Sequence, residues 1–128
     1  MSLNFASVWE MIADLVPDND ALICGEDIVS WKSYDSRSSR VASALTSAGL
    51  GANSKVGLYL NNSNEYLIGQ NAIFKIGGVP INVNYRYVEE ELIYLLDNSD
   101  AEAVFYHACY CSRISQIAQS LPNIKVWI

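Results

Sequence analysis

Three short apolar runs alternate with two longer helical segments between residues 55 and 107, and this alternation constrains the fold more than any other feature of the chain. In the longer segments the apolar residues recur at helical spacing, whereas the short runs have the length of strands. Alternation of this kind is typical of parallel sheets with crossover helices. The predicted strands are residues 56–60, 79–83 and 103–106, and the predicted helices are residues 66–76 and 88–96.

The N-terminal part of the chain can be read as an extension of this unit. Apolar residues at spacings of three and four predict a helix over residues 5–16, which ends before Pro17. Two short apolar runs, residues 20–24 and 28–31, then flank a polar turn that contains Gly25. We predict that they form a small β-hairpin.

A long helix should follow the hairpin, with Ser30 as its N-cap and Gly49 as its C-terminal stop. A further helix and strand are predicted over residues 114–121 and 124–128. The fold class is therefore α/β, a mostly parallel β-sheet flanked by helices on both faces, with a small N-terminal β-hairpin. Because the last predicted strand has no turn or polar tail after it, we expect residues 1–128 to be a truncated part of a larger domain.

The amino-acid composition limits which class of protein this chain can be and which partners it can bind. With 51% hydrophobic and 17% charged residues, the 128-residue chain suits one compact domain. Its net charge of -6 argues against nucleic acid or an anionic membrane as a partner, since both require clustered basic residues. We see no membrane span and no export signal, and three cysteines do not make a disulfide framework, so we expect a cytoplasmic protein.

Two stretches that could suggest ligand binding have ordinary structural explanations. Gly77 and Gly78 follow a predicted helix rather than precede one, so we expect a helix C-cap and not a phosphate-binding loop. The asparagine-rich stretch 61–65 is typical of a turn that leads into a helix, with Ser63 or Asn64 as the N-cap.

Ligands of open α/β sheets collect beyond the carboxyl ends of the strands, and one segment there is more suggestive. Asn84, Tyr85, Arg86 and Tyr87 place a permanent charge between two aromatic rings just before a predicted helix, an arrangement that suits an anion or a stacked ring. The alternative, which we favour, is that Arg86 pairs with Glu89 or Glu90 of the acidic run 89–91 while the tyrosines pack. That acidic run suits the positive end of a helix dipole and needs no catalytic explanation.

The segment 107–113 lies at the same predicted edge and raises the question of a metal site. His107, Cys109 and Cys111 alternate, but on an extended segment they would not close a tetrahedron, and no fourth ligand recurs at a standard spacing. We therefore predict no metal site and expect Cys109 and Cys111 to act as small apolar fillers. His107 has no neighbouring nucleophile in an elbow motif, so we assign no catalytic residue.

Several segments, taken together and in order, resemble the N-terminal portion of the acyl-CoA synthetases in the adenylate-forming, AMP-binding ligase superfamily. The resemblance covers nearly the whole chain, and its most specific part is the segment around Asn84–Tyr87. The matching pieces are residues 5–18, 21–23, 30–31, 37–49, 55–60, 64–66 and 79–87, followed by Glu91 and Leu92.

The resemblance implies a ligase that activates a carboxylic acid, and a fatty acid in particular, with ATP and then transfers the acyl group to coenzyme A. Mg²⁺ would assist the first step by offsetting phosphate charge. The implied partners are small molecules, and a homo-oligomer is compatible with this family. The phosphate loop, the adenine- and ribose-binding segments and the lid lysine of such ligases lie downstream of this region.

The resemblance therefore implies no catalytic or metal-binding residue in this chain, and no ATP, Mg²⁺ or coenzyme A bound by the chain alone. It leaves Asn84, Tyr85, Arg86 and Tyr87 a supporting role around the substrate region. Two alternatives stay open: a stand-alone α/β binding or interaction module derived from such a ligase and, less favoured, a flavodoxin-like or Rossmann-like nucleotide binder.

Overall fold

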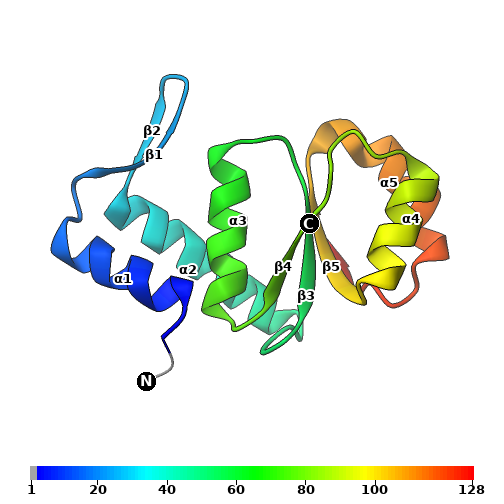
Figure 1. The fold of residues 1–128 in the computed structure, drawn as a ribbon, viewed down its shortest axis with the longest axis horizontal. Helices are drawn as coiled ribbons and strands as arrows, with labels where there is room; N and C mark the ends of the chain where they lie inside the picture. Colours follow the sequence, from blue (N-terminus) through cyan, green and yellow to red (C-terminus); the bar gives the residue numbers. More distant parts are fainter. Residues whose placement is uncertain (1–2) are drawn as a thin grey trace.

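The structure is a computed structural model that describes residues 3–128. It contains a two-stranded antiparallel hairpin and a four-stranded parallel sheet with helices on both faces (Figure 1). The predicted α/β class is therefore confirmed. The elements, in chain order, are α1 (Phe5–Leu15), β1 (Asp20–Cys24), β2 (Asp27–Ser30), α2 (Trp31–Ser47), β3 (Lys55–Tyr59), α3 (Asn64–Lys75), β4 (Val79–Asn82), α4 (Glu89–Asn98), β5 (Ala101–Tyr106), the 3₁₀ turn η1 (Ala108–Tyr110), α5 (Cys111–Ile117), the 3₁₀ turn η2 (Ala118–Ser120) and β6 (Val126–Trp127).

The helix ends lie where the sequence places them. The Ser30 hydroxyl accepts a hydrogen bond from the Ser33 amide, and the Ser63 hydroxyl accepts one from the Tyr66 amide, so both serines cap their helices. Gly77 follows α3 with a φ of 74°, a left-handed conformation that glycine adopts without strain. The expected helix-ending role of the glycine pair is confirmed.

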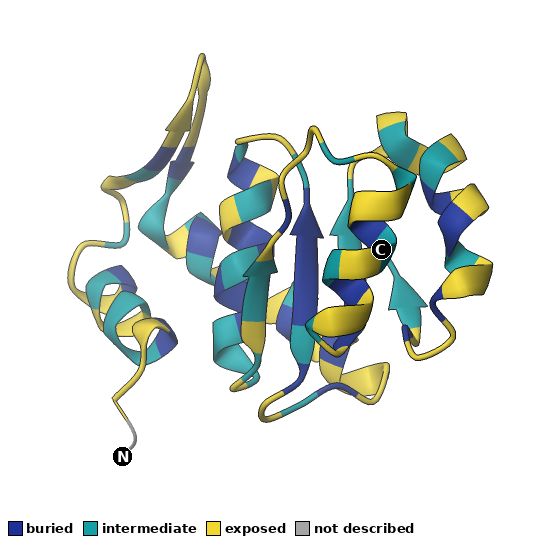
Figure 2. Ribbon diagram, turned by 45° about the vertical axis from the view of Figure 1, so that its right-hand side comes forward, coloured by how far each residue is buried: buried dark blue, intermediate teal, exposed yellow. Residues whose placement is uncertain are grey.

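The sheet has the strand order β4-β3-β5-β6, so β3 is a central strand. Its residues alternate between two apolar layers. Leu58 contributes to the core formed with α2 and α3, and its neighbour Tyr59 contributes to the core formed with α4 and α5. Figure 2 shows this strand buried along most of its length. A strand buried on both faces explains the continuous apolar run that predicted it.

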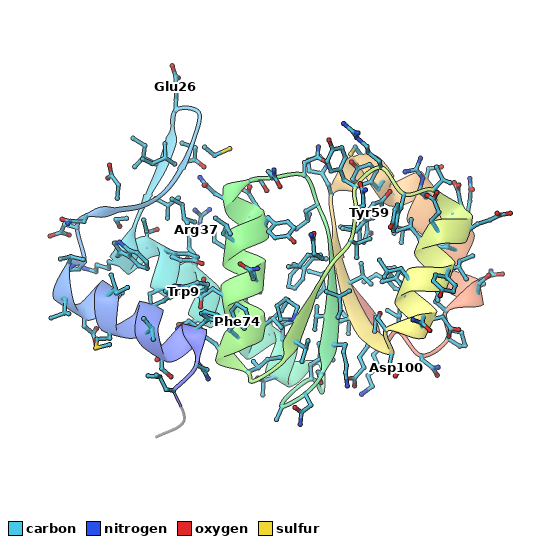
Figure 3. The ribbon with its side chains drawn as sticks, viewed as in Figure 1. Trp9, Glu26, Arg37, Tyr59, Phe74 and Asp100 are labelled. Atoms are coloured by element: carbon cyan, nitrogen blue, oxygen red, sulfur yellow. The ribbon has the colours of Figure 1, made fainter. Side chains whose placement is uncertain are left out.

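Helix α1 packs outside the α2/α3 layer through aromatic and charged contacts. The ring centroid of Trp9 lies 5.8 Å from that of Phe74 (Figure 3). It lies 6.1 Å from the ring centroid of Tyr34. The Lys75 ammonium lies 2.6 Å from the Glu10 carboxylate and 2.7 Å from the Asp35 carboxylate, so one side chain joins α1, α2 and α3. No helix among residues 3–128 is long and apolar enough to cross a bilayer.

The hairpin projects from the body of the molecule but is joined to α3. The Asn64 side chain, which is 2% exposed, donates to the backbone carbonyl oxygen of Asp27 at 3.2 Å and to its carboxylate at 2.8 Å. Ile23 and Ile28 pair across the strands and remain exposed, whereas Leu22 and Val29 are buried against α2 and α3.

Replacement of Gly57 by valine should destabilise the sheet. A Cβ atom at Gly57 would lie 3.1 Å from Leu96 Cδ2 and 3.4 Å from Val104 Cγ2, so a larger side chain overpacks the α4/α5 core. We expect Gly57→Val to lower the free energy of unfolding by about 1–3 kcal/mol in urea titrations. The control Gly51→Ala, at a site with no atom within 4 Å, should stay within about 0.5 kcal/mol of wild type.

Removal of the Lys75 charge should weaken the three-helix contact. Its side chain is 8% exposed, against 53% for Lys125, which pairs with Glu102 at the surface. We expect Lys75→Met to lower the free energy of unfolding by about 1 kcal/mol at pH 7, and Lys125→Met to change it by less than about 0.5 kcal/mol. Equal effects of the two substitutions would contradict this ranking.

The contribution of Lys75 should also depend on pH. Burial by itself favours the neutral amine, but the hydrogen bonds and charges of Asp35 and Glu10 outweigh it and raise the pKa of Lys75 above 10.5. A raised pKa in the folded state means that the stabilisation is fully present below the unfolded-state pKa and is lost as the pH rises through the folded-state pKa. The stability difference between wild type and Lys75→Met should therefore shrink above pH 10.5.

Candidate functional site

The loops that follow β3, β4 and β5 meet at the carboxyl ends of these parallel strands, as the sequence predicts. The Tyr59 hydroxyl, at the end of β3, donates to the carbonyl oxygen of Tyr87 in the β4–α4 loop at 2.9 Å. The Tyr110 hydroxyl, after β5, donates to Asn61 Oδ1 in the β3–α3 loop at 2.8 Å. We call Tyr59, Asn61, Tyr87, Tyr110 and Arg113 the carboxyl-edge cluster.

Arg113 lies at the centre of this cluster. Its Nη1 donates to the Tyr59 hydroxyl at 2.7 Å and to the Tyr87 carbonyl oxygen at 3.1 Å, while its Nε lies 3.5 Å from a carboxylate oxygen of Glu89. The hydrogen bond with Tyr59 raises the pKa of Arg113, so the guanidinium stays charged. The ring of Tyr110 stacks on that of Tyr59 with centroids 4.5 Å apart, and the guanidinium lies 5.9 Å from its centroid. The position of Tyr59 is labelled in Figure 3.

The four residues singled out from the sequence occupy the β4–α4 loop. Asn84 Oδ1 accepts a hydrogen bond from the Arg86 amide at 2.9 Å, and the Tyr87 amide donates to the Asn84 carbonyl oxygen at 3.0 Å, so Asn84 shapes a tight turn. The guanidinium of Arg86 lies 5.6 Å from the centre of the Tyr85 ring, and both side chains are exposed. The carbonyl oxygen of Tyr87 accepts hydrogen bonds from the Tyr59 hydroxyl and from Arg113 Nη1.

The expected pairing of Arg86 with the acidic run is wrong for the part of the chain that the structure describes. Glu89 faces α5 and pairs with Arg113 instead, while Glu91 accepts a hydrogen bond from the Val88 amide at 2.9 Å and so caps α4. Arg86 therefore keeps an exposed guanidinium just before the N-terminus of α4.

The expected role of two cysteines as apolar fillers is also wrong. Cys109 and Cys111 are exposed, because the chain turns into η1 and α5 after β5 instead of continuing as an extended segment. His107 Nδ1 accepts a hydrogen bond from the Cys109 amide at 3.1 Å and caps η1. Residues 3–128 bring together no group of three or more His, Cys, Asp or Glu side chains that could hold a metal ion.

At this edge the described residues offer positioning of loops and an exposed positive charge. Arg113 is already engaged by Tyr59, Tyr87 and Glu89, so it fixes loops, whereas the exposed Arg86 is free to meet an anionic group. Gly77 and Gly78 follow helix α3 rather than precede a helix, and the residues that the structure describes assemble no group of three or more metal-ligating side chains.

Sequence reasoning placed the segment 107–113 at this edge but did not single out Tyr110 or Arg113 within it, and it gave Tyr59 no role in the site. One signal was present for Tyr59, because a tyrosine inside a strand buried on both faces needs a partner for its hydroxyl. Arg113 carried no local signal, since its partners lie 54 and 26 residues away in the chain.

Comparison with known proteins identifies related sequences along almost the whole chain. A family model described as "AMP-binding enzyme" matches residues 9–126. A medium/long-chain-fatty-acid–CoA/3-oxocholest-4-en-26-oate–CoA ligase of Mycobacterium marinum is 41% identical over 125 residues, which are 98% of this chain and 23% of the relative. A 3-oxocholest-4-en-26-oate–CoA ligase of Rhodococcus rhodochrous is 38% identical over 125 residues, 98% of this chain and 22% of the relative.

Solved structures share the fold. The N-terminal domain of FACL13 from Mycobacterium tuberculosis superposes with a TM-score of 0.92 at 22% identity, over 99% of this chain and 34% of that domain. The anthranilate CoA ligase AuaEII, in complex with anthranoyl-AMP, gives a TM-score of 0.92 at 21% identity, over 98% of this chain and 25% of that protein. The chain thus spans about a quarter of the length of the curated relatives.

Removal of the Tyr59 hydroxyl should loosen the carboxyl edge. Without it, Arg113 Nη1 retains only the Tyr87 carbonyl oxygen. We expect Tyr59→Phe to lower the free energy of unfolding by about 1–2 kcal/mol and to speed amide hydrogen exchange in residues 84–88. Tyr94→Phe, at a side chain that is 71% exposed, serves as the control and should change neither. Unaltered exchange in Tyr59→Phe would show that the cluster does not hold this loop.

Proposed function

Since this chain belongs to the AMP-binding enzyme family, we propose that it forms the N-terminal part of an acyl-CoA ligase that acts on a carboxylic acid, and on a fatty acid in particular. The observation that carries the proposal is the 41% identity over 125 residues with a ligase named for medium- and long-chain fatty acids. In the proposed reaction, the substrate carboxylate attacks the α-phosphate of ATP to give an acyl-adenylate and pyrophosphate. The thiol of coenzyme A then displaces AMP and forms the thioester.

Within that ligase we assign residues 1–128 to an N-terminal subdomain with a structural role. Its contribution is to hold three loops in place at the carboxyl edge, through Arg113 and its partners Tyr59 and Tyr87. The loop of Asn84, Tyr85, Arg86 and Tyr87 would support the substrate region, with the exposed guanidinium of Arg86 as the group that attracts an anion.

The reacting groups would come from the rest of the enzyme. Mg²⁺ would supply charge neutralisation on the phosphates in such a ligase. We assign no ligand of Mg²⁺, ATP or coenzyme A to the chain itself, because residues 3–128 assemble no cluster of metal ligands and no phosphate loop. A cytoplasmic location is part of the proposal, since three free cysteines suit a reducing compartment.

A chimera tests the proposal directly. The matched 125 residues of the Mycobacterium marinum ligase are replaced by the corresponding residues of this chain, and pyrophosphate release and acyl-CoA formation are measured with medium- and long-chain fatty acids. We expect kcat/KM to stay within about tenfold of the parent, a change of about 1.4 kcal/mol in transition-state stabilisation.

The isolated 128-residue chain is the matched comparison for the chimera. It should release no pyrophosphate with ATP and fatty acid, because it lacks the reacting groups. A folded chimera without ligase activity would contradict the proposed ligase, and acyl-adenylate formation by the isolated chain would contradict the structural role.

A further inference from the structure

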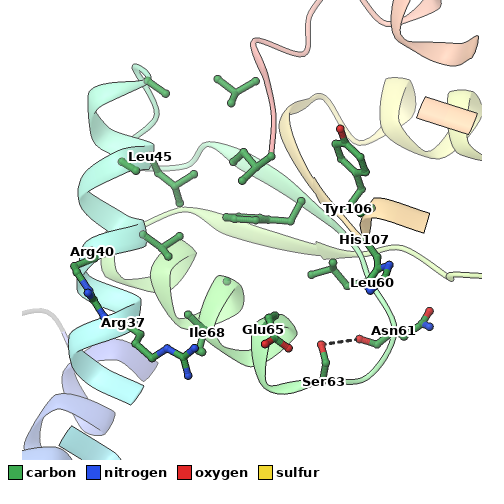
Figure 4. A pocket seen from close by; sticks show the side chains of 18 residues that line it. Arg37, Arg40, Leu45, Leu60, Asn61, Ser63, Glu65, Ile68, Tyr106 and His107 are labelled. Carbon is green, nitrogen blue, oxygen red and sulfur yellow. Dashed lines mark hydrogen bonds between the residues drawn. The ribbon is translucent and has the colours of Figure 1, made fainter. Parts of the chain in front are cut away.

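A pocket on the outer side of α4 differs in charge from the larger pocket beside α2. The larger pocket has a volume of about 1130 Å³, and its lining includes Arg37 and Arg40 (Figure 4). The pocket on α4 has a volume of about 370 Å³, and no basic residue of the described chain lines it. We call it the α4 pocket. Its lining residues come from α4 and from the turn just before it, and they are Tyr87, Glu90, Glu91, Tyr94 and Leu95.

Helical spacing gathers these side chains on one side of α4. Glu90 and Tyr94 are four residues apart, and so are Glu91 and Leu95, so the members of each pair are neighbours on the helix surface. Tyr87 and Leu95 also pack against the α4/α5 core, whereas Tyr94 is 71% exposed. The α4 pocket therefore combines an apolar inner side with aromatic rings and carboxylates that face solvent.

The two carboxylates of the α4 pocket keep most of their capacity to bind a cation. Glu90 forms no ion pair or hydrogen bond with any residue in the range 3–128. Glu91 accepts one hydrogen bond from a backbone amide through Oε2, which leaves its other oxygen available. The neighbouring Arg113 pairs with Glu89 instead, so it does not neutralise either carboxylate of the pocket.

The pocket stays negative when the helix dipole is counted. The N-terminus of a helix carries about half a positive charge. Glu90 and Glu91 each carry a negative charge, so together they outweigh the dipole. The dipole explains why acidic residues begin α4, but it does not account for the two tyrosine rings and the leucine that lie beside them.

The lining indicates which kind of cation fits. Hard metal ions take several oxygen ligands, and residues 3–128 assemble no group of three or more side chains that could hold a metal. Aromatic rings attract organic cations through their negative faces, and quaternary ammonium groups are the ligands best known for this contact. The volume of the α4 pocket also lies within the roughly 300–1,000 Å³ of small-molecule sites.

We propose that the α4 pocket binds a small alkylammonium ion. Glu90 supplies the opposite charge, Tyr87 and Tyr94 supply the aromatic faces, and Leu95 contacts the alkyl groups. Binding covers the exposed ring of Tyr94 and neutralises a carboxylate that has no partner. The proposal goes beyond the proposed function and does not depend on it, because the pocket is complete within this chain.

A titration of the full 128-residue chain with choline tests the proposal. The ring-proton signals of Tyr87 and Tyr94 are followed by NMR. We expect saturable shifts with a dissociation constant below about 10 mM. The uncharged isostere of choline, in which carbon replaces the quaternary nitrogen, should bind at least about fivefold more weakly, because it keeps the shape and loses the charge. Equal binding of choline and the isostere would overturn the proposal.

Exposed positions supply variants that separate the charge from the rings. We expect Glu90→Gln and Tyr94→Leu each to weaken choline binding at least about fivefold, and Tyr94→Phe, which keeps the ring, to stay within about twofold of wild type. Glu26→Gln removes the same charge at the exposed tip of the hairpin and should also stay within about twofold. Equal effects of Glu90→Gln and Glu26→Gln would reduce the binding to general electrostatics and overturn the site.

A parallel titration identifies the source of the ammonium group. A lysine side chain of another protein carries the same chemistry, so the blocked amino acid N-acetyl-lysine amide is compared with choline. Tighter binding of choline points to a free small molecule, and tighter binding of the lysine derivative points to a protein side chain; both uphold an alkylammonium site. Equal shifts with sodium chloride, or no saturation with either compound, would overturn it. No catalysis is measured, so a failed ligase assay leaves this result unchanged.

Discussion

Burial of β3 on both faces is the constraint on which the rest of the structure depends. Val56, Leu58 and Tyr59 have no exposed surface, and consecutive residues of this strand contribute to opposite cores. Each buried aliphatic side chain of this size contributes about 1.5–3 kcal/mol relative to an exposed one. Both layers of helices must therefore form for the central strand to be stable.

At the carboxyl edge, one arginine positions several neighbouring segments. Arg113 joins the end of β3, the β4–α4 loop and the start of α4 through Tyr59, Tyr87 and Glu89. A charged group that is already bound on several sides fixes its neighbours and has little capacity left for a substrate. Preorganised loops of this kind can contribute to a site whose reacting groups are supplied by other parts of a protein.

Most of the fold could be predicted from the sequence because its signals are local. The hydroxyls of Ser30 and Ser63 cap the helices that follow them, and Gly77 ends a helix, so short-range chemistry sets these boundaries. The sequence did not predict contacts set by three-dimensional arrangement. Glu89 pairs with a residue 24 positions later in the chain (113 − 89 = 24) instead of with nearby Arg86, because α4 and α5 pack side by side on one face.

The wrong prediction for Cys109 and Cys111, which follow β5, also concerns a conformation that local sequence does not determine. Alternation at His107, Cys109 and Cys111 suggests an extended segment, yet the chain forms a 3₁₀ turn and a short helix there, and both cysteines face solvent. Spacing alone does not distinguish these conformations in a stretch this short.

The buried Asn64 amide has a mechanical consequence for the projecting hairpin. Two hydrogen bonds from one side chain hold Asp27, so the start of β2 is attached to the first turn of α3. A lone two-stranded ribbon has little stability of its own in water. Because β2 also runs directly into α2, whose N-cap is Ser30, the ribbon is anchored to both α2 and α3 and is not a free flap.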